Sequence, residues 1–528
     1  MVKKFKNSPE SISSALLLWG ERATQTAIAA KYDIKVWPAT NILNSGPLHF
    51  NIPPQPKGFL TEISVVTKVK LQKNKKDIET PERNVAIINN FANSLFTSVD
   101  VALDERSDIT QSMTNVYPYL SFFNTVLNSE SNRIDDLFYQ QRFLMDGGSC
   151  KADEERCRDF WKFDYPYYNW TMKEKLMTHH KTDATKKAAL DKLKEPLWTA
   201  DKGKEEDIKK IETELNITDA NKNDNTWFDI IHAIDHAWIP NVINPAAALR
   251  SRELVRGKTV TLVTPLHVPI FNTTKCLPNE MKIRITLNKN KDKFLLLTNE
   301  DEGEEKYSVY LEDCFLHIYY YQPHDAVIKA IDDRLKIDPA SYIIDKPEII
   351  HKPITNAGRI VRINDVFQKV PAYAFFCLQN NKDFDGAVKT NPFTFIPFEK
   401  FQFYSNGVPH FKDPLEVGNM MQENSKVLPH EFGDYLKQLH KTIGRDITGD
   451  CLINSSNFAL NFIVGMSFGA DRSNITQNHL NVQEEASTYL EIDMGINTDI
   501  PKDMLLIVYC LYNQQILIDG NRQVEIIE

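Results

Sequence analysis

Two histidines could bind a metal ion. His232 and His236 are four residues apart, so on a helix they would share one face. Imidazole pairs with this spacing occur in zinc sites. In zinc proteases a glutamate that acts as general base directly follows the first histidine, but here that position is Ala233. We therefore interpret the two histidines as a structural or interfacial pair and predict no metal site.

The cysteines and one acidic run offer two more ways to bind a cation. Cys150 and Cys157 could ligate zinc or form a disulfide, although their spacing fits no common zinc finger. The chain has seven scattered cysteines and no C-x-x-C, which is typical of reduced thiols. Residues 300–305 (EDEGEE) could attract calcium but lack the alternating ligands of an EF-hand loop. We interpret this run as a solvated hairpin turn, and His179–His180 as solvated too.

One serine lies in a pattern that serine hydrolases use. The sequence from Gly465 to Gly469 fits G-x-S-x-G, in which the serine sits on a sharp turn between a strand and a helix. A strand pattern precedes Ser467, but no helix pattern follows it directly. We interpret the motif as the end of a strand. The sequence therefore predicts no catalytic residue, no cofactor and no enzyme activity.

Two aromatic runs could stack bases or sugars. They are Tyr319–Tyr321 and the segment from Tyr165 to Trp170. Packing at strand ends and contact between subunits explain such runs more simply.

Composition indicates a large globular protein. The chain has 528 residues, 42% of them hydrophobic, and a net charge of -9. A protein that condenses nucleic acid usually carries a basic arm or face, whereas the basic run at 3–6 is short. We therefore predict no direct sequence-specific nucleic-acid binding. The apolar run at 16–19 is too short for a signal peptide, and none approaches the roughly 20 residues of a membrane span. We expect synthesis in the host cytosol and no transmembrane segment.

Most of the chain shows the two-residue periodicity of β-strands. Ile63, Val65, Thr67, Val69 and Leu71 alternate with a more polar set, as in a strand that covers a core. Further strands are predicted at 85–103, 281–287, 306–321, 359–363, 372–378, 393–398, 401–404, 459–468, 488–496 and 505–518. Helices are predicted at 8–30, 326–335 and 431–443. Short strands separated by turns, without βαβ alternation, predict an all-β protein of sandwiches or barrels.

The order of these segments suggests two similar halves. Strands flank the predicted helix at 326–335 on both sides, which suits two consecutive antiparallel jelly rolls of about eight strands each. We divide the chain into an N-terminal arm or helix (1–45), a first jelly roll (46–323), a connecting helix (324–345) and a second jelly roll (346–528). A charged, partly helical insertion at about 150–235 interrupts the first.

Several collinear motifs resemble one protein family. They are Thr24–Ile28, Gly46–Pro53, Asn89–Leu127, Pro265–His267, Ile270–Phe271, Ile283–Leu287, Lys291–Asp292 with Phe294, Asn391–Phe393, Ile507–Tyr509, Ile518–Asp519 and Asn521–Arg522. Together they resemble the major capsid proteins of Polinton/Maverick elements and adintoviruses, the double jelly-roll lineage that includes adenovirus hexon. The insertion looks longer than the family norm, and Pro269 and Pro278–Glu280 depart from the usual residues.

The resemblance implies a structural role. Three chains would form a homotrimeric, pseudo-hexagonal capsomer, and such capsomers would tile an icosahedral virion capsid together with penton and minor capsid proteins. In such a shell we expect structural or interface roles for ten residues: Phe91, Leu95, Phe96, Tyr117, Pro118, Tyr119, Asn391, Pro392, Phe393 and Arg522. Core or turn packing is the alternative role for each. The N-terminal segment to about Ala39 would reach neighbouring subunits or minor proteins.

Two alternative functions stay open. One is a carbohydrate-binding or glycan-processing jelly-roll protein, which would need aromatic platforms and, for hydrolysis, a pair of carboxylates. The other is a capsid-derived scaffold retained by a host genome.

Overall fold

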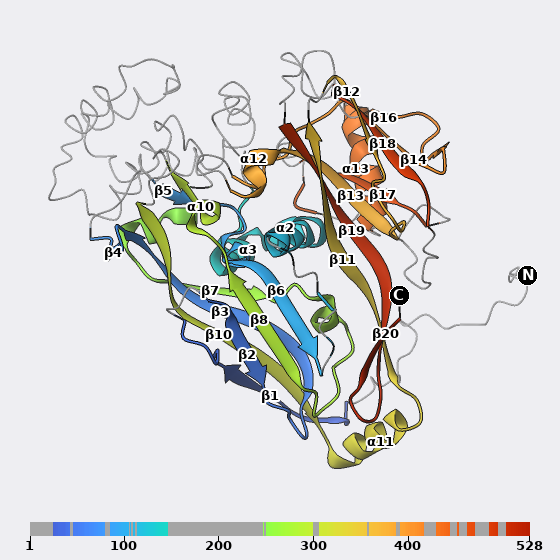
Figure 1. Cartoon of the computed structure of the whole chain (residues 1–528). Coiled ribbons are helices and arrows are strands. Elements are labelled where there is room, and N and C mark those ends of the chain that lie inside the picture. Colours follow the sequence, from blue (N-terminus) through green and yellow to red (C-terminus); the bar gives the residue numbers. More distant parts are fainter. Residues whose placement is uncertain are drawn as a thin grey trace, which may run out of the picture.

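Antiparallel strands dominate the computed structural model (Figure 1). It describes residues 25–42, 46–79, 85–104, 106, 109–110, 113, 115–145, 247, 250–298, 306–355, 358–386, 391–416, 429–443, 451–453, 462–469, 485–494 and 503–527. The insertion at about 150–235, with its cysteine, histidine and aromatic candidates, lies outside these residues, and so does the acidic run at 300–305.

The first half contains two main sheets. One has the strand order β1 (Ile28–Val36), β10 (Tyr307–Pro323), β3 (Phe59–Lys73) and β7 (Val260–Pro265), and the short β4 (Lys76–Asp77) also pairs with β3. The other has the order β2 (Leu48–Ile52), β8 (Ile283–Lys289) and β6 (Phe96–Leu103). A short ladder joins β5 (Val85–Ile87) to β9 (Leu296–Thr298). Alternate residues of both sheets enter one buried apolar cluster, which makes this half a sandwich.

The second half repeats the arrangement. One sheet has the order β11 (Ala340–Thr355), β19 (Asp503–Ile518), β13 (Tyr373–Asn380) and β17 (Val464–Ser467), and β20 (Val524–Ile527) pairs with the end of β19. The other has the order β12 (Ile360–Asn364), β18 (Thr488–Asp493) and β14 (Lys400–Ser405), with β15 (Val408–Pro409) and β16 (Leu415–Glu416) beside β14.

The pairing scheme is the same in both halves. In each half the first strand pairs with the last long strand, which also pairs with the third: β1–β10–β3 matches β11–β19–β13. The second strand pairs in the same way, since β2–β8–β6 matches β12–β18–β14. The duplication is thus visible in the topology, whereas no repeat is visible in the sequence.

Helices lie beside and between the sandwiches. Among the described residues they are α1 (Phe91–Ser94), α2 (Val116–Asn128), α3 (Ile134–Gln141), α10 (Asp292–Leu295), α11 (Asp325–Leu335), α12 (Asn381–Phe384) and α13 (Pro429–Ile443), with short 3-10 turns at Ser131–Arg133, Leu254–Arg256 and Pro269–Asn272. The predicted helices at 326–335 and 431–443 correspond to α11 and α13. Figure 1 shows α11 at one end of the molecule, where the chain passes from β10 to β11.

Four sequence-based assignments need correction. The helix predicted to reach Ala30 cannot do so, because β1 begins at Ile28 and pairs with β10. The strand predicted over 85–103 is interrupted by α1, where the buried polar pair Asn89 and Asn90 begins a helical turn. Residues 393–398 form no strand, although Ile396 makes one bridge to Leu378. Phe393 and Phe395 alternate as they would in a strand, but this segment forms no ladder, and its phenylalanines are buried in the core.

The fourth correction concerns β11, which begins inside the segment predicted as a connecting helix. Pro347 and Pro353 make this sequence untypical of a central strand, because proline lacks the N–H that such a strand needs. Within the described residues β11 pairs only with β19, so it tolerates both prolines as an edge strand. We now propose that the first sandwich starts near residue 28 and the second near residue 340.

Candidate functional site

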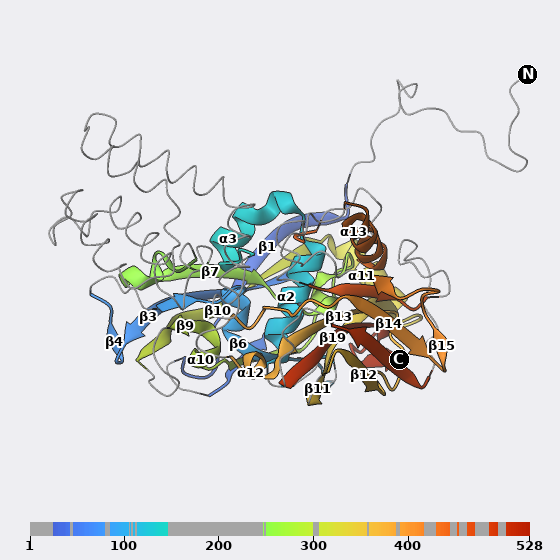
Figure 2. The ribbon, with the colours of Figure 1, turned by 90° about the horizontal axis from the view of Figure 1, so that it is seen from above.

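Helix α2 lies between the two sandwiches and contacts both of them (Figures 1 and 2). It packs on β6 of the first half and on β11 of the second. Eleven of its thirteen residues are buried, so it is apolar on nearly every side. A helix that is hydrophobic all round is typical of a fully enclosed position. The contact between the two halves is therefore the candidate functional site.

Aromatic rings from both halves meet on α2. We call the following residues the junction cluster: Tyr119, Phe122 and Phe123 of α2, Phe393 and Phe395 of the segment before β14, and Tyr509 of β19. Phe122 stacks on Phe393 with ring centroids 4.5 Å apart and planes only 4° apart. Phe123 stacks on Phe395 at 5.8 Å and on Tyr509 at 5.3 Å. Each of these rings is at most 3% exposed, so the contact excludes water.

The hydroxyl of Tyr119 connects the halves through hydrogen bonds. It lies 3.0 Å from Oε1 of Gln379 in β13 and 3.1 Å from the carbonyl oxygen of Pro392, and both oxygens are acceptors. The amide of Gln379 also donates to the Pro392 carbonyl. Burial raises the pKa of Tyr119 well above its ordinary value, so the phenol remains a donor. Its ring stacks on Phe384 at 4.9 Å.

Two of the predicted motifs therefore meet here. Tyr117–Tyr119 and Asn391–Phe393 are far apart in the sequence, but Tyr119 touches both Pro392 and Phe393. The Asn391 side chain accepts a hydrogen bond from the backbone N–H of Phe393, at 3.2 Å, and so shapes the turn that presents this ring. The sequence analysis identified both motifs but did not predict that they contact each other.

Buried asparagines fix α1 against α2, and the sequence analysis gave them no role of their own. Asn90 has a left-handed φ of 52° and begins α1. Its side chain donates to the Pro118 carbonyl at 3.0 Å and to the Ser121 hydroxyl at 2.8 Å. Asn93 donates to Asn90 at 2.9 Å. The signal was present in the sequence as an asparagine pair between apolar residues.

The remaining first-half candidates are core residues around this network. Phe91, Leu95, Phe96 and Tyr117 are all at most 6% exposed. Tyr117 accepts a 3.3 Å hydrogen bond from the backbone N–H of His267, the histidine of the Pro265–His267 motif. Whether any of the ten predicted residues also touches a second subunit stays a prediction.

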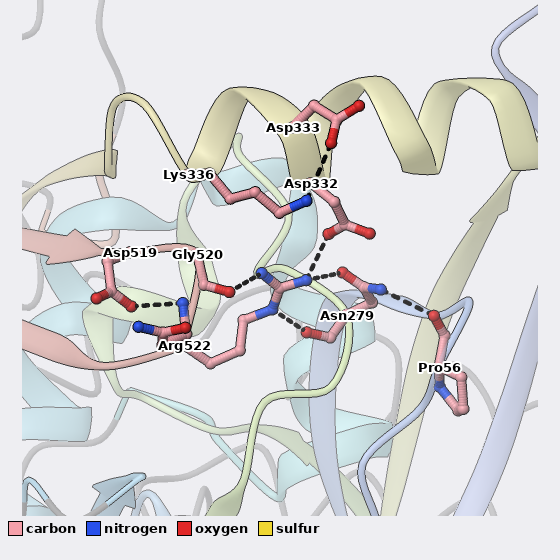
Figure 3. Close-up of polar contacts among 9 residues, drawn as sticks. Pro56, Asn279, Asp332, Asp333, Lys336, Asp519, Gly520 and Arg522 are labelled. Carbon is pink, nitrogen blue, oxygen red and sulfur yellow. Dashed lines mark hydrogen bonds and ion pairs between the residues drawn. The ribbon is translucent and has the colours of Figure 1, made fainter.

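Arg522 forms a second connection between the halves (Figure 3). It lies in the turn between β19 and β20 with a φ of 66°. Its guanidinium donates to the backbone oxygen and the side-chain oxygen of Asn279, at 2.8 and 2.6 Å, and forms a 2.6 Å ion pair with Asp332 of α11. Asn279 in turn donates to the Pro56 carbonyl at 2.8 Å.

This clamp joins the three parts of the chain. Asn279 and Pro56 belong to the first sandwich, Asp332 to the connecting helix and Arg522 to the second sandwich. Only 11% of the Arg522 side chain is exposed, so solvent screens these bonds less than at a free surface. The Pro278–Glu280 segment therefore contributes to the contact between the halves through Asn279.

The described residues give no support to the chemical candidates. Ser467 is buried within β17 and pairs with Tyr373, as expected for a strand and not for a nucleophile elbow. Tyr320 points into the core and stacks on Tyr32, while Tyr319 and Tyr321 lie on the other side of β10. Within the described part of the chain, no three His, Cys, Asp or Glu side chains are grouped to hold a metal ion.

The five described cysteines are free thiols, and four of them are buried. In the same described ranges, no helix is long and apolar enough to span a bilayer.

Solved structures share this architecture over nearly the whole chain. A chain in the cryo-EM structure of the Sputnik virophage has a TM-score of 0.52 and 10% identity, with 99% of this chain and 93% of that chain covered. VP54 of PBCV-1, fitted into a reconstruction of Sputnik, has a TM-score of 0.51 and 10% identity, with 97% and 99% covered. The chain has the double jelly-roll fold.

The mavirus major capsid protein is also similar, with a TM-score of 0.47, 10% identity, and 100% and 96% covered. No family model and no curated protein matches the sequence. The Sputnik and VP54 comparisons and the sheet topology confirm the double jelly roll predicted from the strand pattern and the resemblance.

Proposed function

We propose that this chain is a major capsid protein. Its double jelly roll extends along nearly the full length of two solved chains to which it is similar, in the Sputnik virophage and PBCV-1 structures. The observation that carries the proposal is the pair of sandwiches with one topology, joined by a dry aromatic contact. The role is structural, and we assign no catalytic residue.

Three copies of such a chain would give a pseudo-hexagonal capsomer. Because each chain supplies two similar sandwiches, a closed three-fold ring presents six similar blocks around its axis. The junction cluster and the Arg522 clamp would hold the two blocks of each chain at one fixed angle, since packed interiors deform little. A fixed angle is what repeated tiling of an icosahedral shell requires.

The finer assignments belong to the same proposal. The collinear motifs favour the Polinton/Maverick and adintovirus lineage. A capsomer of this kind would meet penton and minor capsid proteins in the virion, and would need no direct sequence-specific contact with nucleic acid. The chain carries a net charge of -9, which disfavours binding to phosphates through bulk charge.

Light scattering of the purified protein tests the proposal. We expect a particle of three times the 60.8 kDa of one chain, without dependence on added ligand. A stable monomer at assembly concentrations would overturn the capsomer. Specific binding of the monomer to an array of glycans would favour the carbohydrate-binding alternative.

A further inference from the structure

An apolar row crosses the outer face of the first sandwich. Phe315 of β10 lies opposite Val66 of β3, which in turn lies opposite Val263 of β7. Trp37 directly follows β1, and its ring centroid is 5.6 Å from that of Phe315. Leu316, the next residue of β10, is fully buried in the core, so Phe315 points outward. We call Trp37, Phe315, Val66 and Val263 the outer row, whose two ends, Trp37 and Val263, are 56% and 36% exposed.

The second sandwich has a corresponding row, which is buried. Ile349 of β11 lies opposite Tyr509 of β19, and Tyr509 lies opposite Phe375 of β13. Phe376, the next residue of β13, points into the sandwich instead and meets a ring of β14 at 5.1 Å. Helix α2 covers the row, since its Phe123 stacks on Tyr509 at 5.3 Å. The three residues of this row are at most 3% exposed.

One of two equivalent sheet faces is thus covered within the chain, whereas the other is open at both ends of its row. The sheets β1–β10–β3–β7 and β11–β19–β13–β17 have the same strand order. The helix that covers the second sheet comes from the connection between β6 and β7 of the first half. The corresponding connection of the second half, between β16 and β17, carries α13, on which Lys437 and Lys441 are exposed. Figure 1 shows α13 well apart from β1 of the same chain.

Polar side chains border the outer row. Further along β1 and β10, His317 lies 2.6 Å from Asp33, and the ammonium of Lys31 lies 4.9 Å from the ring centroid of Tyr319. An apolar centre with a polar rim is typical of a surface that binds another protein.

We propose that the outer row is the surface on which the second half of a neighbouring copy docks, by the side that carries α13. The contact between chains would then repeat the contact between the halves of one chain. This inference rests on the proposed function and names the surface that holds the capsomer together. Because the two surfaces differ, the contact is head-to-tail, and such contacts close into a ring when the rotation fits. Trp37 would be the main anchor, since a large aromatic side chain often dominates such a contact.

Trp37→Glu combined with Val263→Glu tests the proposal. Both residues are exposed, so we expect the circular dichroism spectrum and the melting temperature of the parent, while light scattering gives the mass of one chain instead of three. Ile337→Glu is the matched control, because Ile337 is 74% exposed after α11 and lies outside the outer row. It should keep the mass of three chains. A folded double variant that also keeps this mass would overturn the inference.

Cross-linking tests the same contact without a substitution. Ordinary and isotope-labelled chains are mixed before assembly and treated with a short amine-reactive reagent. We expect Lys31 or Lys35 of one chain to be joined to Lys437 or Lys441 of another. A trimer without this link overturns the inference and leaves the capsomer standing, and so does a trimer in which Lys31 is joined only to Lys3 of its own chain. A parent protein that stays monomeric at every concentration refutes the capsomer, and the inference falls with it.

Discussion

Phe393→Ala is the substitution that tests the contact between the sandwiches most sharply. The Phe393 ring lies between three rings of the first half: it stacks on Phe122 at 4.5 Å and meets Tyr119 and Phe294 edge-on at 5.3 and 6.2 Å. It is 2% exposed, so its removal leaves a cavity that water does not readily fill. Truncation of a buried phenylalanine costs about 3–5 kcal/mol.

The expected loss can be divided between burial and ring pairing. Most of it is the transfer and cavity cost, while each well-formed aromatic pair adds about 0.5–1.5 kcal/mol. A double-mutant cycle with Phe122→Ala should therefore show a coupling of about 1 kcal/mol between the two rings. The free energy of unfolding is measured by urea titration, followed by circular dichroism and by tyrosine and tryptophan fluorescence.

Val408→Ala is the matched control in the same half. Val408 is 65% exposed in β15, so its truncation should change the free energy of unfolding by no more than about 0.5 kcal/mol. The reasoning is refuted if Phe393→Ala costs less than about 1 kcal/mol, or if the losses of the Phe122 and Phe393 variants simply add.

Three further substitutions probe the remaining contacts. Arg522→Met should lower the free energy of unfolding by about 2 kcal/mol in a urea titration, because two oxygen acceptors of Asn279 lose their donor. Arg522→Lys should not restore this loss, and full rescue by lysine would argue against the two-pronged guanidinium geometry. Tyr119→Phe should cost about 1–3 kcal/mol, because the buried amide oxygen of Gln379 loses a donor, and a neutral result would contradict that bond. Burial lowers the pKa of His267 from 6.5 to about 4, so the unfolded chain binds the proton first as the pH falls. This group should remove about 3 kcal/mol of stability between pH 6.5 and 4 and have no effect above that range; a His267→Gln variant with the same pH slope as the parent would disprove it.

The sequence predicted the elements whose pattern is local. Alternation at Ile63–Leu71 is enough to identify β3, because one face of that strand covers the core. Helix α13 was predicted from apolar residues on one face, and its Tyr435 and Leu439 are indeed buried. Such patterns depend only on neighbours along the chain.

The sequence patterns did not predict contacts between distant segments. Nothing local distinguishes Phe393 and Phe395, as junction residues, from the same alternation in a strand. Likewise, Pro347 disfavours a central strand, and only the sheet order shows that β11 is an edge strand, where proline is tolerated. The role of Arg522 depends on Asn279 and Asp332, which the fold brings to it from two other parts of the chain.

Electron microscopy of the purified particle tests most directly whether the two sandwiches of each chain form a capsomer that can build a capsid shell. We expect a three-fold particle with six similar β-sandwich densities around its axis, and two-dimensional hexagonal arrays at high concentration. A monomeric particle, or a closed assembly without three-fold symmetry, would contradict the proposed capsomer.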